Sequence, residues 1–319
     1  MVDFSQLLHE QLAAIEPYAP PFADRSAVNL ALNEHPLPPP PAVQALLAEV
    51  DGARLVGYDT ERSQALTERL AEREGVGPEN ILLCAGESQA LASLIASLRR
   101  SELLYPEVCW SYFHTLATLH GHSIRRYPIA RDHGRGFTIE LPALLAEARR
   151  GAPSLVLFIN PHMPLGFLTA RARIEACAAE LSDTLVLVDE AYAGFSAAFE
   201  SMAPRVREVP NLIVAKTFSK YFGLASARVG YLVADAALVA ELRKAESPFR
   251  LSYLSASIAL VALDEEESYR RYAAEVMATM ERFRARTNAT PGARALPTAA
   301  NFVLVEFADV DAAERVQAR

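Results

Sequence analysis

A lysine flanked by hydroxyl groups is the most chemically suggestive feature of this sequence. Lys220 follows Thr217 and Ser219, and Gly223 and Arg228 come shortly after it. A lysine amine can form a Schiff base with an aldehyde, and hydroxyl and guanidinium groups can bind a phosphate. The segment is therefore suited to hold a phosphorylated aldehyde covalently. Because most lysines are solvated surface residues, this interpretation depends on the rest of the chain.

Polar residues also follow three further apolar segments, at 81–84, 155–159 and 185–188. The first segment leads into a turn of small residues that opens a predicted helix, where backbone N–H groups can receive a phosphate. The second ends at an amide and the third at a carboxylate. The residues concerned are Gly86, Glu87 and Ser88 in the first turn, Asn160 after the second segment, and Asp189 and Tyr192 after the third. Each of these ends thus carries groups that can bind a ligand.

The elements that must position these groups alternate between helices and short apolar strands. The predicted helices are 42–50, 60–74, 87–100, 111–121, 140–150 and 169–182, and the predicted strands are 81–84, 102–105, 124–128, 154–160, 184–189, 211–215 and 229–233. Several strands are wholly apolar, as expected for strands covered by helices on both faces. We therefore predict an α/β fold with a mostly parallel seven-stranded sheet, and ligands at the carboxyl ends of its strands.

The two ends of the chain differ from this alternating region. Residues 4–15 have helical spacing, and the proline-dense stretch up to residue 41 predicts an extended arm laid over another part of the protein. After residue 233 come long helical stretches, at 236–246 and 255–286, and a closing strand at 301–307. We predict an N-terminal helix and arm over 1–40, a large domain over 41–240 and a smaller α+β domain over 241–319.

Composition narrows the classes of function. The chain has 319 residues, 51% of them hydrophobic, and a formal net charge of −8 with scattered Lys and Arg, so no nucleic-acid partner is predicted. No apolar run approaches membrane-spanning length, and the N-terminal residues lack the pattern of a signal peptide. Three cysteines without paired spacing argue against a disulfide framework or a zinc site. We expect a cytoplasmic protein with no metal and no membrane partner.

In order and spacing, these signals resemble those of the fold-type I pyridoxal-phosphate enzymes. More narrowly, the chain resembles the class I and II aminotransferases of the aspartate-aminotransferase superfamily, in the histidinol-phosphate aminotransferase-like branch. The resemblance covers about residues 15–307, and its most specific parts are the run from Ser219 to Gly230 and the tetrapeptide from Asp189 to Tyr192. It implies pyridoxal 5′-phosphate as cofactor in the large domain. The implied activity is transfer of an amino group between an amino acid, or an amino-acid-like amine, and a 2-oxo acid.

The resemblance also implies catalytic roles. Lys220 would bind the cofactor aldehyde as a Schiff base and later move the proton between the substrate Cα and the cofactor C4′. Asp189 would keep the pyridine nitrogen protonated, so that the ring can accept electrons. Asn160 and Tyr192 would hydrogen-bond the 3′-oxygen of the ring.

The remaining cofactor contacts follow in the same way. Trp110 would stack on the ring face, with Tyr112 or Phe113 as alternatives. Tyr58 stands where the family sends a tyrosine from the neighbouring subunit to the phosphate, which implies a homodimer with shared active sites. The phosphate would otherwise be held by backbone groups around Gly86, Glu87 and Ser88 and by the side chains of Thr217, Ser219 and Arg228.

Two departures from the family pattern leave the substrate open. The loop from Pro161 to Gly166 lacks the second asparagine and the threonine that are common in the family. The family arginine that binds the substrate carboxylate lies beyond the strand matching 301–307, and Arg315 and Arg319 do not match its motif. Either the carboxylate is held otherwise, with Tyr18 and Asn33 as candidates, or the small domain is abbreviated.

Two rival functions remain at this point. A decarboxylase, lyase or oxidase could use the same scaffold, since the cofactor stabilises a carbanion whichever Cα bond breaks. A non-catalytic relative could have kept the fold as a sensor or an assembly partner. The joint presence of Lys220, Asp189, Tyr192, Asn160 and Arg228 argues against the second rival, because a pure binding module needs none of them.

Overall fold

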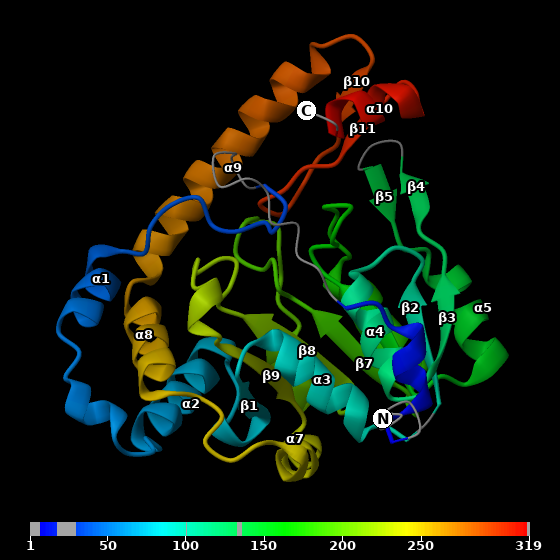
Figure 1. The fold of residues 1–319 in the computed structure, drawn as a ribbon. Helices are drawn as coiled ribbons and strands as arrows, with labels where there is room; N and C mark the ends of the chain where they lie inside the picture. Colours follow the sequence, from blue (N-terminus) through cyan, green and yellow to red (C-terminus); the bar gives the residue numbers. More distant parts are fainter. Residues whose placement is uncertain (1–6, 18–29, 100, 133–135, 318–319) are drawn as a thin grey trace, which may run out of the picture.

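A seven-stranded sheet forms the centre of the protein in the computed structural model, which describes residues 7–17, 30–99, 101–132 and 136–317 (Figure 1). The strand order is β1-β9-β8-β7-β6-β2-β3, and β9 alone runs antiparallel to its neighbours. The strands are β1 (Ile81–Cys84), β2 (Glu102–Pro106), β3 (Ser123–Tyr127), β6 (Leu155–Ile159), β7 (Leu185–Asp189), β8 (Leu212–Thr217) and β9 (Gly230–Ala234). The predicted α/β class and mostly parallel seven-stranded sheet are confirmed.

Helices cover both faces of this sheet, which explains the wholly apolar strands. In β6, Val156 and Phe158 face one core, and Leu155, Leu157 and Ile159 face the other. Helices α2, α5, α6 and α8 contribute to the first core, and α3, α4 and α7 to the second. Full burial of one such side chain stabilises the fold by about 1.5–3 kcal/mol. The helices on both faces therefore stabilise the sheet, and the polar residues lie at the carboxyl edge of this sheet.

The helices of the alternating region lie close to their predicted positions. Helix α2 ends where Gly75 adopts a left-handed conformation with φ of 69°, which glycine tolerates without strain. The α-helices between residues 41 and 242 are α1 (Pro41–Ala48), α2 (Glu61–Glu74), α3 (Glu87–Ser97), α4 (Ser111–Leu119), α5 (Leu141–Gly151), α6 (Arg171–Glu180) and α7 (Ala236–Leu242). Short 3₁₀ helices are η3 (Gly52–Leu55), η4 (Pro78–Asn80), η5 (Ala203–Arg207), η6 (Ala225–Ala227) and η7 (Arg243–Ala245).

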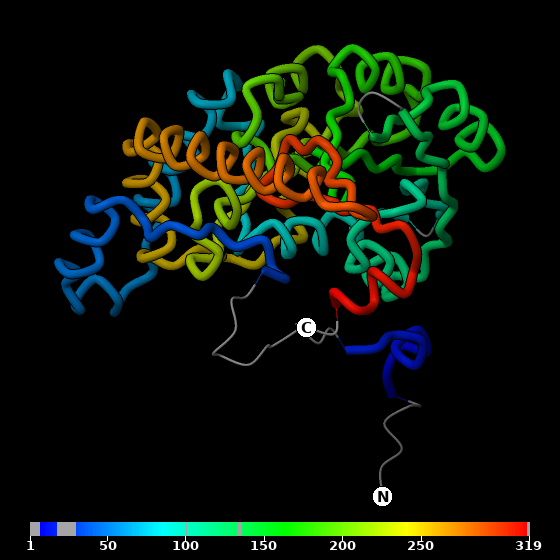
Figure 2. The backbone as a smooth tube through the Cα atoms, turned by 90° about the horizontal axis from the view of Figure 1, so that it is seen from above, coloured from blue at the N-terminus to red at the C-terminus, as the bar shows by residue number. Residues whose placement is uncertain are grey.

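The N-terminal arm runs beside a long C-terminal helix. Residues 30–40 pass across α9 (Glu266–Asn288), where the rings of His35 and Tyr272 lie 6.0 Å apart (Figures 1 and 2). The predicted helix over 4–15 is wrong in its extent, because the described part forms only the 3₁₀ helix η2 (Glu10–Ala14). Residues 1–6 lie outside the described residues. The arm is thus extended, as its prolines predict.

The C-terminal region combines two helices with a small hairpin. Helix α8 (Tyr253–Asp264) packs against α1 and α2, and α9 leads to the hairpin of β10 (Ala293–Ala295) and β11 (Val305–Phe307), followed by α10 (Val310–Gln317). The division of the chain at residues 40 and 240 stays a prediction. A second hairpin, β4 (Ala130–Asp132) with β5 (Gly136–Thr138), was not predicted.

The predicted strand over 301–307 is too long. Only residues 305–307 pair with β10, while residues 301–304 form a loop. Asn301 donates a side-chain hydrogen bond to the carbonyl of Asn33, and the ring of Phe302 packs edge-on against Tyr192. These residues therefore contact the arm and the site in place of forming a strand ladder.

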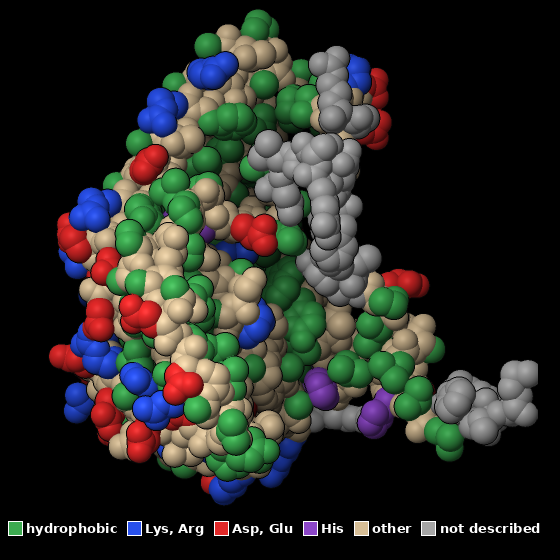
Figure 3. Space-filling view, turned by 60° about the vertical axis from the view of Figure 1, so that its left-hand side comes forward, with side chains coloured by type: hydrophobic (Ala, Val, Ile, Leu, Met, Phe, Trp, Pro, Cys, Tyr) green, Lys and Arg blue, Asp and Glu red, His purple; other side chains and the backbone are tan. Residues whose placement is uncertain are grey.

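The described surface has mixed charge. Acidic and basic side chains are interspersed on the face shown in Figure 3. Among residues 7–17, 30–99, 101–132 and 136–317, no helix has the length and apolar character needed to cross a membrane.

Candidate active site

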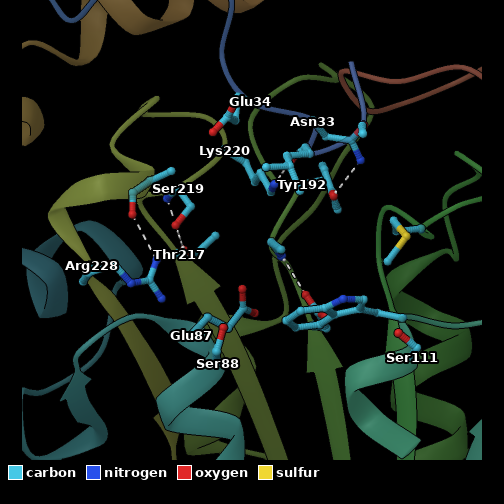
Figure 4. Close-up of a pocket in the computed structure, with 17 residues that line it drawn as sticks. Asn33, Glu34, Glu87, Ser88, Ser111, Tyr192, Thr217, Ser219, Lys220 and Arg228 are labelled. Carbon is cyan, nitrogen blue, oxygen red and sulfur yellow. Dashed lines mark hydrogen bonds between the residues drawn. The ribbon is translucent and has the colours of Figure 1, made fainter. Parts of the chain in front are cut away.

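A cavity of about 440 Å³ lies at the carboxyl edge of the sheet, under the N-terminal arm (Figure 4). It is formed by the ends of β7 and β8, the start of α3, the start of α4 and residues 31–34 of the arm. The structure brings together nine of the predicted site residues as its lining: Glu87, Ser88, Trp110, Asp189, Tyr192, Thr217, Ser219, Lys220 and Arg228.

Lys220 lies in the middle of this cavity. Its Nζ atom donates a hydrogen bond of 2.6 Å to the carbonyl of Leu32 in the arm, and stands 5.7 Å from the ring centre of Tyr192. Burial lowers the pKa of Lys220, and the carboxyl groups of Glu87, Glu34 and Asp189 oppose this shift only in part. A larger fraction of the amine is therefore neutral, and so nucleophilic, near neutral pH.

Asp189 marks the acidic end of the cavity. It is the last residue of β7, is buried, and accepts a hydrogen bond of 2.9 Å from the backbone N–H of Ala191 at Oδ1. Burial raises the pKa of Asp189, while the Ala191 N–H, a hydrogen bond with Glu87 and the charge of Lys220 oppose this. A cation placed against this carboxyl group would keep it ionised.

The opposite end of the cavity offers donors to an anion. Thr217 Oγ1 lies 3.0 Å from Ser219 Oγ, and Arg228 Nη1 donates to the carbonyl of Ala225 at 3.0 Å. A Cβ atom at Gly86 would stand 2.2 Å from Arg228 Nη2, and Gly86 has φ of 88°. Glycine is thus required for the guanidinium to reach the start of α3, where the first N–H groups have no carbonyl partner within the helix.

Tyr192 is tied to the arm. Its hydroxyl oxygen accepts a hydrogen bond of 3.0 Å from Asn33 Nδ2, and its ring contacts Phe302 edge-on at 5.0 Å. Burial raises the pKa of Tyr192 to about 12; the bond from Asn33 opposes the shift, and the charge of Asp189 adds to it. The phenol therefore keeps its proton at neutral pH and can donate it in a hydrogen bond.

Of the three aromatic candidates Trp110, Tyr112 and Phe113, Trp110 is the one that lines the cavity. Its ring lies 4.9 Å from that of Tyr112 and 6.2 Å from that of Phe113. Neither of these alternatives lines the cavity, and Phe113 is fully buried in the core. Trp110 is thus the ring available to stack on a flat ligand.

Three predicted site residues, Gly86, Asn160 and Tyr58, are not part of the cavity lining. Gly86 acts by making room, as described. The amide of Asn160 is buried and pairs with the backbone of Thr169, accepting from its N–H at 2.9 Å and donating to its carbonyl at 3.1 Å. It closes a turn and keeps one amide N–H for another acceptor. Tyr58 is 81% exposed and stacks on Phe249 at 4.2 Å, away from the cavity of its own chain.

Residues of the arm are the main lining groups that the sequence analysis missed. Leu32 contributes a carbonyl, Glu34 a carboxylate, and Asn33 was considered only for a substrate carboxylate. Ser111 and Met163 also line the cavity. The proline-dense stretch predicted a covering arm, but a backbone contact such as that of Leu32 leaves no signal in the side-chain pattern. Tyr18, the other candidate for the carboxylate, lies outside the described residues.

This set of groups fits a flat aromatic aldehyde that carries a phosphate. The amine of Lys220 shares the cavity with the carboxyl of Asp189, suited to a ring nitrogen, and with the hydroxyls of Thr217 and Ser219 and the guanidinium of Arg228, suited to a phosphate. The space beside Gly86 that a Cβ would fill, and the buried acid group opposite, agree with that orientation. A mostly parallel sheet with these groups at its carboxyl edge defines a fold-type I pyridoxal-phosphate enzyme.

The chain belongs to the family "Aminotransferase class I and II", whose model matches residues 25–318. It is 33% identical to the histidinol-phosphate aminotransferase of Aromatoleum aromaticum, over 97% of this chain and 87% of that protein. It is 32% identical to the histidinol-phosphate aminotransferase of Syntrophotalea carbinolica, over 87% of this chain and 78% of that protein. The predicted branch of the family and the predicted aminotransferase class are confirmed.

The solved structures agree with the sequence relatives. The crystal structure of histidinol-phosphate aminotransferase from Sinorhizobium meliloti in complex with pyridoxal-5′-phosphate has a TM-score of 0.81 and 26% identity, and the match covers 89% of this chain and 76% of that chain. The predicted fold type is thereby confirmed at the level of three-dimensional structure, and pyridoxal phosphate is the cofactor of this enzyme class.

Proposed function

We propose that this cavity transfers an amino group between an amino acid, or an amino-acid-like amine, and a 2-oxo acid. The observation that carries the proposal is that Lys220, a half-buried amine of lowered pKa, shares one cavity with Asp189 and Arg228. When bound, pyridoxal 5′-phosphate supplies an aldehyde that receives the amino group and a ring that accepts electrons. The side chains supply binding, orientation and proton transfer.

Lys220 has two tasks in this proposal. Its neutral amine binds the cofactor aldehyde covalently, which the lowered pKa favours. With cofactor and substrate bound, the free Nζ would take the proton from the substrate Cα and deliver it at the cofactor C4′. The carbonyl of Leu32, which accepts from Nζ at 2.6 Å, holds the amine at this position.

The other side chains orient the cofactor. Asp189 would pair with the pyridine nitrogen, and the protonated phenol of Tyr192 would donate to the 3′-oxygen of the ring, where Asn160 could add its remaining N–H. Trp110 covers one ring face. Thr217, Ser219 and Arg228 bind the phosphate together with the N–H groups around Gly86, Glu87 and Ser88.

The first amino donor to test is L-histidinol phosphate, because the curated relatives carry its name. The purified protein, loaded with cofactor, is incubated with this donor and a panel of amino acids, without acceptor and then with a 2-oxo acid. We expect a stoichiometric oxo product in the first step and a new amino acid in the second. Release of CO₂ or ammonia without an oxo product would instead indicate the decarboxylase or lyase alternative on the same scaffold.

We further propose a homodimer in which Tyr58 completes the partner's site. Tyr58 lies in an exposed apolar patch with Leu55, Val56 and Phe249, which are 56%, 90% and 55% exposed. Exposed apolar patches of this kind mark protein interfaces. Mixing inactive Tyr58→Ala and Lys220→Ala chains tests whether the two subunits share their active sites. In a hybrid dimer, one site combines the intact Lys220 of one chain with the intact Tyr58 of the other. Restored activity supports sharing, and an inactive mixture of confirmed hybrid dimers contradicts it.

A cytoplasmic location completes the proposal. Cys84, Cys109 and Cys177 are all free thiols in the structure, as is usual in a reducing compartment. Fractionation of cells that produce the protein tests this, and recovery in the membrane or periplasmic fraction would contradict it.

A further inference from the structure

Glu87 has no assigned role for its side chain, yet it points into the cavity (Figure 4). It is the first residue of α3, where the backbone faces the anion-binding end, and it is only 9% exposed. Its Oε1 atom has no hydrogen-bond partner among the described residues. A buried polar atom without a partner is costly, so this position calls for a physical reason.

The carboxyl group of Asp189 supplies that reason. Both carboxyl groups are buried and line the same cavity, and a hydrogen bond between them is among the causes that shift the pKa of each. Two ionised carboxylates can only accept hydrogen bonds, so a bond between them requires one proton on the pair. Two like charges at this distance in a buried site do not both ionise, and a single shared proton is the stable arrangement.

The surrounding charges favour the proton on Glu87. The charged groups that face it are Asp189 and Glu190 at the end of β7 and Lys220 after β8, with the Arg228 guanidinium against the neighbouring Gly86. Burial raises the pKa of Glu87 well above its ordinary value, Asp189 and Glu190 raise it further, and Lys220 opposes them. Asp189 in turn accepts from Ala191, which favours its ionised form.

We propose that Glu87 is a positioning residue that donates a hydrogen bond to Asp189 and thereby keeps Asp189 ionised against the pyridine nitrogen of the cofactor. A donor on the far side of a carboxylate stabilises its charge and makes it a weaker base. The proton between Asp189 and the ring nitrogen then stays on the nitrogen. Glu87 thus acts on the electron-accepting ring through Asp189. This inference rests on the proposed function of the cavity.

The test compares three forms of the holoenzyme, reconstituted with cofactor labelled with ¹⁵N in the ring. Wild type and Glu87→Gln, which keeps a donor, are expected to give the chemical shift of a protonated ring nitrogen. Glu87→Leu, which removes the donor and preserves the volume, is expected to shift toward the unprotonated value and to lower kcat roughly tenfold, the effect of losing one hydrogen bond to a charged group. Circular dichroism confirms that each variant is folded.

Two outcomes would overturn the inference. If Glu87→Gln changes the ring nitrogen as much as Glu87→Leu does, the side chain acts as a negative charge and not as a donor. If neither variant changes the shift, the side chain does not act on Asp189. A carboxyl titration of the apoprotein by NMR separates this from failure of the proposed function: the pKa of Asp189 should rise in Glu87→Leu and stay unchanged in Glu87→Gln, whether or not any substrate is turned over.

Discussion

Two half-buried lysines, four positions apart, have different surroundings. Lys216 is 12% exposed and pairs with Glu74 at 2.6 Å and Glu190 at 3.2 Å. Lys220 contacts the carbonyl of Leu32 and faces the open cavity. Burial opposes the charge of both amines, but the two carboxylates overcome it and raise the pKa of Lys216, whereas the pKa of Lys220 is lowered. Burial alone therefore does not make a lysine reactive. The charged groups beside the amine determine whether its pKa is raised or lowered.

The alternation of β-strand residues separates these two regions. Leu212 and Val214 of β8 face the core on the side of α2, and Lys216 continues that face toward Glu74 of α2. Ile213 and Ala215 face the other core, and Thr217 continues toward the cavity. The same strand thus carries an ion-paired cluster on one side and the cofactor-facing groups on the other. The ion pairs of Lys216 with Glu74 and Glu190 hold β8 in place, and this keeps the residues at the end of β8 in position around the cavity.

The largest expected effect is loss of activity in Lys220→Ala. Removing the amine takes away both the covalent attachment and the proton transfer, so we expect turnover to fall by about 10⁴-fold. Steady-state assays with an amino donor and a 2-oxo acid measure this. Retention of more than a tenth of the activity would show that another residue moves the proton.

Lys216→Met should instead reduce stability. The change removes the cation that Glu74 and Glu190 share and leaves Glu74 with Arg73 Nε at 3.7 Å, which costs about 3–5 kcal/mol of unfolding free energy. Lys220→Met is the matched control and should change the free energy of unfolding by less than about 1 kcal/mol, since Nζ donates to the Leu32 carbonyl and forms no ion pair within the part of the chain that the structure describes. Urea denaturation measures both variants. Equal losses would mean that the two lysines do not differ as described.

Asp189→Asn should lower kcat by about 10²–10³-fold, the usual effect of removing one preorganised charge from a reacting site. The amide cannot hold the ring nitrogen protonated. Asp183→Asn, at an exposed position before the same strand, is the control and should be neutral. The comparison of kcat in the two variants decides whether the carboxylate at the strand end matters to the chemistry.

The smallest effect concerns pH. Because burial lowers the pKa of Lys220, the rate of covalent cofactor attachment to the apoprotein should rise with pH and level off below 10.5, the ordinary value. Glu34 opposes this shift, so Glu34→Gln should move the midpoint further down. Stopped-flow absorbance across a pH series measures both midpoints. A wild-type midpoint at or above the ordinary lysine value would contradict the assigned surroundings.

The part of the candidate site that lies at strand ends could be predicted from the sequence, because each strand is an apolar run that ends at polar residues. Apolar runs ending at Asp189 and before Thr217 fixed which side chains meet at the sheet edge. Contacts between distant segments were not predictable in this way. The carbonyl of Leu32 reaches Lys220 across 188 positions, and the amide of Asn160 turns to Thr169. Such contacts depend on how the arm and the loops pack, which local patterns do not encode.

Borohydride reduction of the cofactor-loaded protein, followed by peptide mapping, tests the central claim most directly. Reduction fixes the cofactor to the amine that holds it. We predict a phosphopyridoxyl group on Lys220 and none on Lys216, although both lysines are half-buried and close in sequence. A label on Lys216, or cofactor-loaded protein with no label on Lys220, would contradict this account.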